Sequence, residues 1–233
     1  KNKKLYEICE LLEADTSEIS TEEVRDRVKI ILDAMKDAIE KGLKSKEKSM
    51  SGMCGDDCAK LLERYKSGHS LFSETYQKML TYSLATIEQN LRMGKIVACP
   101  TAGSCGIVPA VIIAIAESIN AGEEEQINAL ITAGLIGKIV ANKLALAGAV
   151  AGCQSECGVA AAMAAAGLVE MYNGTNEQIL SAAALTLKNI MGLVCDPVAG
   201  LVEVPCVKRN AFLAIYAVTG AELAMANIQS DIP

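Results

Sequence analysis

The residues with the clearest chemical potential are cysteines: the 233-residue chain has nine, and four of them lie close together in its second half. Cys153, Cys157 and Cys195 have glycine or proline within two residues, so we expect them in loops that present a thiolate. Cys206 follows Pro205 and is expected in the first turn of a helix, where the dipole lowers the pKa of a thiol. We interpret these cysteines as ligands of an iron–sulfur cluster.

The spacing of these cysteines differs from that of zinc and ferredoxin sites, which use pairs separated by two residues. Three residues separate Cys153 from Cys157, Cys195 stands alone, and Cys206 follows it after ten residues. Ligands on separate loops suit a cluster held inside a fold. The pattern also permits three protein ligands for a four-iron cluster, and the open iron would then act as a Lewis acid toward a substrate.

Polar residues near the cysteines are candidates for binding that substrate. Thr101 and Ser104 lie in a small-residue loop before a helix, where hydroxyls and backbone N–H groups can bind a carboxylate. A simple tight connection explains the same loop equally well. Arg209 and Asn210 follow Cys206 by three and four residues and therefore share its helical face. For Arg209 the alternative is a side chain that faces solvent or pairs with a nearby carboxylate.

A second group of metal-binding residue types lies earlier in the chain. Cys54 and Cys58 flank Gly-Asp-Asp, and His69, the only histidine, follows eleven residues later. A zinc half-site is conceivable, but we favour an interpretation in which Asp56 or Asp57 caps the next helix. The cysteines are then incidental, and His69 is a solvent-facing turn residue.

The elements that must position these residues are helices, and we predict an all-α fold: a single compact helical domain with functional loops between its helices. Amphipathic helices over 1–45 are expected to pack on a catalytic domain over 46–233. The ranges 127–146, 158–172 and 179–191 are apolar around most of their surface and rich in alanine, so they belong at the centre. We expect the chain to leave the helical conformation between 127–146 and 158–172. The backbone N–H and C=O groups exposed there need hydrogen-bond partners, which a bound cofactor would supply.

Composition narrows the functional class. The chain is 51% hydrophobic but only 3% aromatic, which favours close helix packing over a β-sandwich. Its uninterrupted apolar runs fall short of the roughly 20 residues that cross a membrane, and the start Lys1–Lys4 does not read as a signal peptide. A net charge of −6 argues against nucleic-acid binding. We expect a cytoplasmic protein with reduced thiols, whose chain continues beyond Ile232-Pro233.

Three segments, 99–106, 151–158 and 195–210, closely resemble the α subunit of iron–sulfur-dependent L-serine dehydratase. The likeness covers about residues 50–230, and its motifs occur in the family's order. It implies an all-helical catalytic domain with an oxygen-sensitive [4Fe–4S] cluster whose ligands match Cys153, Cys195 and Cys206. Cys157 departs from the family's pattern, and its role stays open.

The resemblance also implies a reaction and partners. L-serine would lose water to give aminoacrylate, which hydrolyses to pyruvate and ammonia, with the substrate carboxylate oriented by Thr101, Ser104 and Arg209. In two-chain members a β subunit supplies a Ser-Ser-His-type motif, which this sequence lacks. We therefore expect a β subunit, an oligomer, and a catalytic base that no residue here identifies.

Three rival functions remain open from sequence. A pyridoxal-phosphate serine dehydratase would need an α/β fold and a Schiff-base lysine, so we expect no pyridoxal phosphate. A non-enzymatic zinc or redox scaffold would use Cys54, Cys58, Cys153 and Cys157. A related cluster lyase would act on cysteine or another hydroxy-amino acid.

Overall fold

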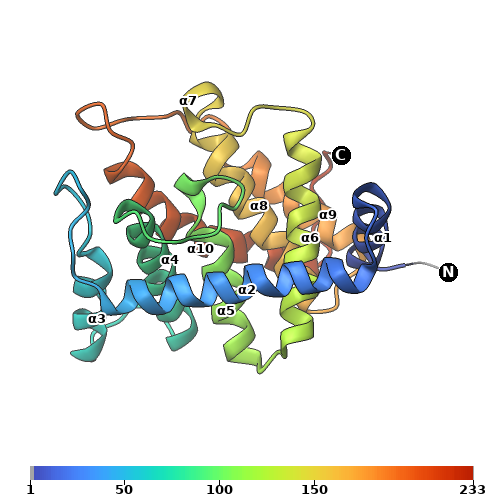
Figure 1. Cartoon of the computed structure of the whole chain (residues 1–233), viewed down its shortest axis with the longest axis horizontal. Helices are drawn as coiled ribbons and strands as arrows, with labels where there is room; N and C mark the ends of the chain where they lie inside the picture. Colours follow the sequence, from blue (N-terminus) through green and yellow to red (C-terminus); the bar gives the residue numbers. More distant parts are fainter. Residues whose placement is uncertain (1–2, 233) are drawn as a thin grey trace.

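The alanine-rich helix α8 (Cys153–Met171) lies at the centre of the structure and contacts α5, α6, α9 and α10 (Figure 1). Every residue from Cys157 to Met171 is buried, as expected for a helix that is apolar on all sides. Small side chains allow this packing: a Cβ atom at Gly167 would lie 2.7 Å from the carbonyl oxygen of Ala129 on α6. The chain thus uses glycine and alanine to bring helix backbones together.

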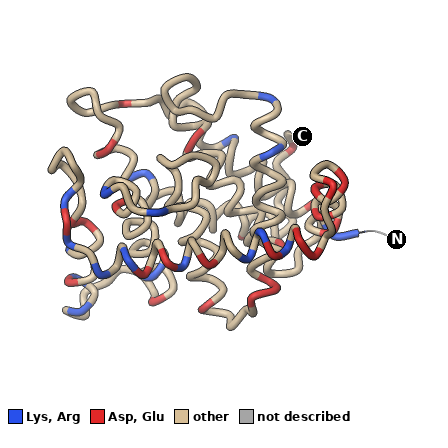
Figure 2. Tube along the Cα trace, in the orientation of Figure 1, with Lys and Arg blue, Asp and Glu red and all other residues tan. Residues whose placement is uncertain are grey.

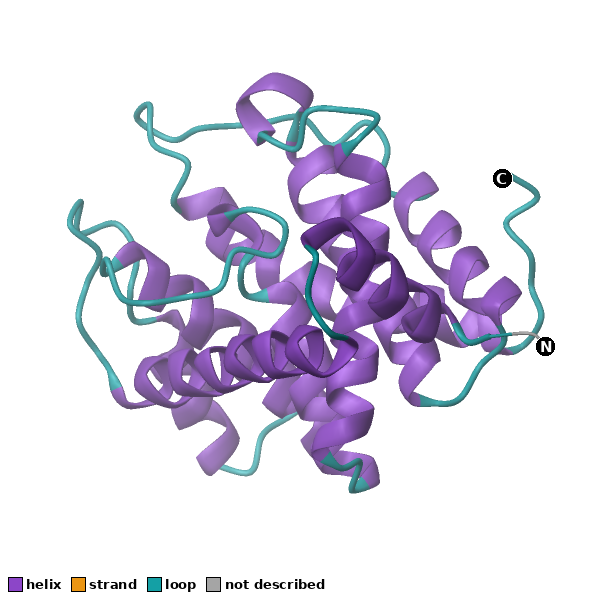
Figure 3. Ribbon diagram, turned by 45° about the vertical axis from the view of Figure 1, so that its right-hand side comes forward, coloured by secondary structure: helices purple, strands orange, loops and turns teal. Residues whose placement is uncertain are grey.

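The computed structural model describes residues 3–232. Within this range the regular secondary structure is all helical, with loops between the helices and no β-strand (Figure 3). The predicted all-α class and single compact domain are confirmed. The helices, in chain order, are α1 (Leu5–Ser17), α2 (Thr21–Lys44), α3 (Asp57–Lys66), α4 (Glu74–Leu91), the 3₁₀ turn η1 (Ala102–Ser104), α5 (Ile107–Ile119), α6 (Glu123–Ala141), α7 (Gly148–Ala151), α8 (Cys153–Met171), α9 (Asn176–Lys188) and α10 (Val204–Met225).

Helix α5 supplies the second apolar centre, because its residues from Ile107 to Ala116 are all buried. By length and composition alone, the window Ala102–Ile119 is apolar enough to cross a membrane, and 72% of it is buried inside the protein. Core helices of soluble proteins pass the same test. The expectation of no membrane span rested only on uninterrupted apolar runs. It missed this window because glycine, serine and other small residues interrupt the apolar run. The absence of a membrane span therefore stays a prediction.

The two N-terminal helices lie against the core to different degrees. Helix α2 runs across α4 and α6, and its N-cap is Ser20, whose hydroxyl accepts a hydrogen bond from the Glu23 N–H at 3.0 Å. It buries one face, as its spacing predicts. Helix α1 has no fully buried residue, and Leu12 of its predicted apolar stripe is 48% exposed. The domain boundary at residue 45 stays a prediction.

Charged residues lie mainly on the outer helices, while the central helices carry few (Figure 2). Helix α2 shows this arrangement, with ion pairs one turn apart between Lys41 and Asp37 and between Lys44 and Glu40. Such exposed pairs contribute little stability each. Burial of the apolar core, to which α5 and α8 contribute, therefore stabilises the fold more than these ion pairs do.

Candidate functional site

Two loops at one end of the helices, residues 142–152 and 189–203, precede α8 and α10 and lie side by side (Figure 1). Direct hydrogen bonds join the second loop to the start of α8: the Gln154 N–H donates to the Leu193 carbonyl at 2.9 Å, and the Gly192 N–H donates to the Gln154 side chain at 2.8 Å. Gly152 has φ of +79°, and a Cβ atom there would lie 2.8 Å from the Leu193 oxygen. This close approach holds the loop that carries Cys195 against the start of α8.

Three of the sequence-predicted ligands meet at this point. Cys153 is the first residue of α8, Cys206 lies in the first turn of α10, and Cys195 lies in the intervening loop. Cys153 and Cys206 are buried, and Cys195 is half-buried. Burial, followed by the charge of Cys153, raises the pKa of both Cys195 and Cys206, so Cys153 lies near each of them. The expected loop position of Cys153 and Cys157 is wrong, because α8 already begins at Cys153.

Cys153 is the thiol most readily deprotonated in this group. Its pKa falls to about 6 because Cys157, one turn further on α8, donates a hydrogen bond to it and the guanidinium of Arg209 lies beside it. The distance from Arg209 Nη1 to Cys153 Sγ is 3.0 Å. The same hydrogen bond and burial in the main core raise the pKa of Cys157. Cys157 therefore supports the Cys153 thiolate from inside the core.

The prediction that the dipole of α10 lowers the pKa of Cys206 is wrong. Burial raises that pKa to about 12, and the nearby charges of Cys153 and Glu156 raise it further. The helix begins as predicted, with Pro205 in its first turn, but Cys206 is only 5% exposed. Desolvation of the thiolate thus outweighs the dipole at this position.

Arg209 lies at the cysteines rather than in solvent. Its side chain is 17% exposed, and its Nη1 atom also pairs with the carboxylate of Asp196. The predicted alternative, pairing with a nearby carboxylate, is therefore also realised through Asp196, whereas Glu203 accepts a hydrogen bond from the Ser49 hydroxyl at 2.8 Å. A guanidinium thus lies beside Cys153 and close enough to Cys195 and Cys206 to influence the pKa of both.

Asn210, predicted to bind substrate, is fully buried, and its amide is used within the chain. Its Oδ1 atom accepts a hydrogen bond from the Gly106 N–H at 2.9 Å. Its Nδ2 atom donates to the carbonyls of Gly103 and Cys206, both at 2.8 Å. These contacts favour a positioning role, because they tie the loop before α5 to the start of α10.

The two hydroxyls of that loop differ in what they contact. Ser104 is fully buried and donates to the Cys99 carbonyl at 3.0 Å, so its hydroxyl points into the loop. Thr101 is half-buried, and its hydroxyl donates to the carboxylate of Glu156 on the first turn of α8. Glu156 was not selected from sequence, although its place between Cys153 and Cys157 was a signal that it shares their surroundings.

The alternative zinc site is not assembled. Cys54 and Cys58 are buried in a small separate core beneath α4, and burial raises the pKa of Cys58 to about 12. His69 is exposed in a turn, 3.2 Å from the Ser67 hydroxyl. No group of three or more His, Cys, Asp or Glu side chains in residues 3–232 surrounds a single metal position. The ligands of a four-iron cluster bind different iron atoms, so they need not meet at one point.

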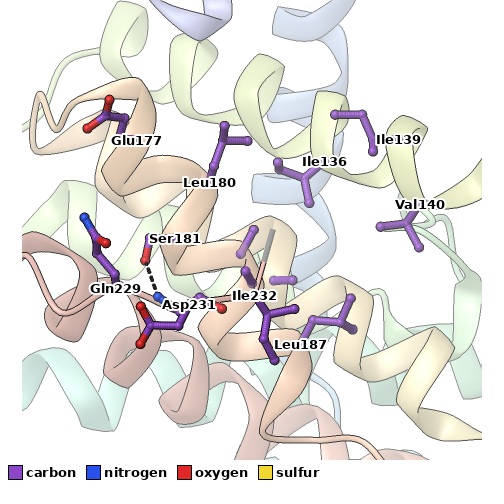
Figure 4. Close-up of a pocket in the computed structure, with 14 residues that line it drawn as sticks. Ile136, Ile139, Val140, Glu177, Leu180, Ser181, Leu187, Gln229, Asp231 and Ile232 are labelled. Atoms are coloured by element: carbon purple, nitrogen blue, oxygen red, sulfur yellow. Dashed lines mark hydrogen bonds between the residues drawn. The ribbon is translucent and has the colours of Figure 1, made fainter.

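A cavity of about 690 Å³ lies elsewhere, between α6, α9 and residues 229–232 (Figure 4). Aliphatic side chains such as Ile136 and Leu187 form most of its wall, and Ser181 accepts a hydrogen bond from the Ser230 N–H at 3.2 Å. None of its lining residues is a cysteine, arginine or lysine. The cavity therefore lacks the positive group that would bind a carboxylate, and we place the candidate site at the cysteines.

Comparison with known proteins identifies the family of the chain. The family model described as serine dehydratase alpha chain matches residues 1–233. A probable L-serine dehydratase, alpha chain, of Bacillus subtilis (strain 168) is 46% identical over 221 residues, 95% of this chain and 73% of that protein. The L-serine dehydratase, alpha chain, of Peptoniphilus asaccharolyticus is 40% identical over 230 residues, 99% of this chain and 79% of that protein. L-serine dehydratase TdcG of Escherichia coli (strain K12) is 43% identical over 145 residues, 62% of this chain and 32% of that protein. This chain therefore belongs to the serine dehydratase alpha chain family.

Proposed function

We propose that this chain is the catalytic α subunit of an iron–sulfur-dependent L-serine dehydratase, a lyase that forms pyruvate and ammonia. The names of the relatives support the substrate and the reaction. The observation that carries the proposal is the approach of Cys153, Cys195 and Cys206, from three separate elements, beside Arg209. Three thiols that do not surround one metal position fit a [4Fe–4S] cluster with three protein ligands.

The proposed cluster and the chain divide the chemistry between them. When bound, such a cluster supplies a Lewis-acidic iron that makes the substrate hydroxyl a better leaving group. Arg209 binds the substrate carboxylate, because its planar guanidinium offers two parallel N–H donors. Asn210 donates a hydrogen bond to the loop that carries Thr101 and so holds this loop against α10. Loss of the Cα proton and of hydroxide gives aminoacrylate, which tautomerises and hydrolyses to pyruvate and ammonia.

The base that takes the Cα proton is assigned to a partner chain. The relatives in Bacillus and Peptoniphilus are named as alpha chains, which supports a second subunit. This chain matches only 32% of the Escherichia coli relative, so there the matching region belongs to a longer polypeptide. We infer a β subunit that covers the cysteine end and contributes a histidine. The proposal further includes a cytoplasmic location, assembly into oligomers and sensitivity to oxygen.

The test is anaerobic purification of the chain together with its β subunit, followed by measurement of iron, labile sulfide and pyruvate formed from L-serine. We expect iron and sulfide in comparable amounts, a broad visible absorption band and pyruvate production. Cys195→Ser should lower iron content and abolish activity, whereas Cys9→Ser, on α1 away from the site, should change neither. Zinc without iron or sulfide would overturn the cluster, and a cluster-loaded complex that forms no pyruvate would overturn the reaction.

A further inference from the structure

Glu156 lies in a narrow space that two glycines create. Its carboxylate is on the first turn of α8 and accepts a hydrogen bond from the Thr101 hydroxyl. A Cβ atom at Gly103 would overlap one carboxylate oxygen, and a Cβ atom at Gly148 would overlap the other. The carboxylate therefore lies between the loop before α5 and helix α7, and a side chain at either glycine would displace it.

This carboxylate has no cation of its own. None of the ion pairs formed by residues 3–232 includes Glu156. The other carboxylate near the cysteines, Asp196, is paired with Arg209. Its one hydrogen-bond partner among side chains is the neutral Thr101 hydroxyl, so the half-buried carboxylate can accept further hydrogen bonds, which suits a positively charged ligand.

Glu156 also lies three residues after Cys153 at the start of α8, on the same face of the helix. Its negative charge contributes to the raised pKa of Cys206 and of Cys157, and it opposes the lowering of the pKa of Cys153. Arg209 contacts the same Cys153 at 3.0 Å, so a carboxylate and a guanidinium lie on either side of this cysteine and offer opposite charges to one small ligand.

We propose that Glu156 binds the α-ammonium group of the substrate and thereby restricts the site to amino acids. This inference rests on the proposed function, in which Arg209 binds the carboxylate of L-serine. An amino acid carries one charge of each sign on adjacent atoms, and this pair of side chains matches both. A hydroxy acid of the same shape, such as L-glycerate, leaves the carboxylate of Glu156 without a partner, and the site rejects it.

The experiment measures binding of L-serine and L-glycerate to the anaerobic, cluster-loaded complex with the β subunit. Calorimetry gives the affinity for L-glycerate, and initial-rate kinetics give its inhibition constant and the KM for L-serine. Glu156→Gln removes the charge and keeps the size of the side chain. We expect KM for L-serine to rise at least about tenfold, as for other charged hydrogen bonds, while the affinity for L-glycerate stays unchanged or improves. The preference for the amino acid then falls at least about tenfold.

Two further variants separate binding from a structural effect. Glu222→Gln removes an exposed carboxylate from α10 away from the site and should leave both ligands and the iron content unchanged. Gly148→Ala keeps Glu156 but displaces its carboxylate, and it should weaken L-serine more than L-glycerate. If Glu156→Gln loses its cluster, the ligand preference of Gly148→Ala decides the inference.

The possible failures are distinguishable. If the wild-type complex forms pyruvate but Glu156→Gln keeps the wild-type preference for L-serine over L-glycerate, the ammonium role is wrong and the proposed function stands. An equal loss of affinity for both ligands assigns Glu156 a structural role and also overturns the inference. If the cluster-loaded wild-type complex forms no pyruvate, the proposed function and this inference fail together.

Discussion

Replacing Asn210 with alanine removes three hydrogen bonds from a fully buried side chain. The Gly106 N–H is buried and loses its acceptor, which costs about 1–3 kcal/mol. The half-buried Gly103 carbonyl loses a donor and can reach water, and the Cys206 carbonyl keeps its helical partner, so these contribute less. We expect the free energy of unfolding to fall by about 2–4 kcal/mol in total.

The assay is urea unfolding followed by circular dichroism at 222 nm. With a slope of about 3 kcal/mol per molar urea, a loss of about 3 kcal/mol lowers the midpoint by about 1 M. The control is Asn142→Ala, since Asn142 is exposed at the end of α6 and should change stability by less than about 0.5 kcal/mol. If Asn210→Ala unfolds at the same urea concentration as this control, Asn210 does not position the loop, and the direct substrate role is favoured again.

Three other predictions concern packing, pH and substrate binding. Gly42→Ala places a methyl group against the backbone of Ala85 on α4 and should lower the free energy of unfolding, measured in urea, by about 1–3 kcal/mol. In the control Gly134→Ala the new methyl group meets no atom, and the free energy of unfolding should rise by up to about 1 kcal/mol. Equal effects of the two substitutions would contradict this prediction. Burial raises the pKa of Glu170, so its favourable contribution is complete below the unfolded pKa and is lost as pH rises through the folded pKa. Glu170→Gln should therefore be more stable relative to wild type at pH 7 than at pH 4, and a difference independent of pH would refute the sign. Arg209→Lys should keep its iron while KM for L-serine rises at least about tenfold, or about 1.4 kcal/mol; normal kinetics in the loaded variant would remove Arg209 from the site.

The helical fold was predictable because its signals are local and repeat along the chain. The apolar, alanine-rich stretch that became α8 could only be a buried helix in a chain with so few aromatic residues. Helix ends were predicted less well. Helix α6 ends at Ala141 rather than residue 146, and α8 starts at Cys153 rather than residue 158. Packing and capping contacts decide such ends, and spacing alone does not contain them.

The sequence named residues that the structure places near Cys153, but it did not predict their surroundings. The cysteines and Arg209 were identified by type and motif, and the structure places them together. The pKa of Cys206 was predicted with the wrong sign, because burial by distant segments outweighs the local helix dipole. The internal hydrogen bonds of Asn210 and the place of Glu156 were not predicted, because their partners, Gly106 and Thr101, lie far away in sequence.

The enclosure of α8 by four other helices has a consequence for motion in the protein. A helix buried on all sides cannot shift without repacking its neighbours, so Cys153 at its start is anchored to the least mobile part of the chain. Cys195 lies instead in an exposed loop joined to α8 by two hydrogen bonds. Backbone amides of α8 should therefore exchange hydrogen slowly and those of residues 189–203 quickly. Entry and release of small molecules then depend on the loop, while the helix provides a fixed reference for the reacting atoms.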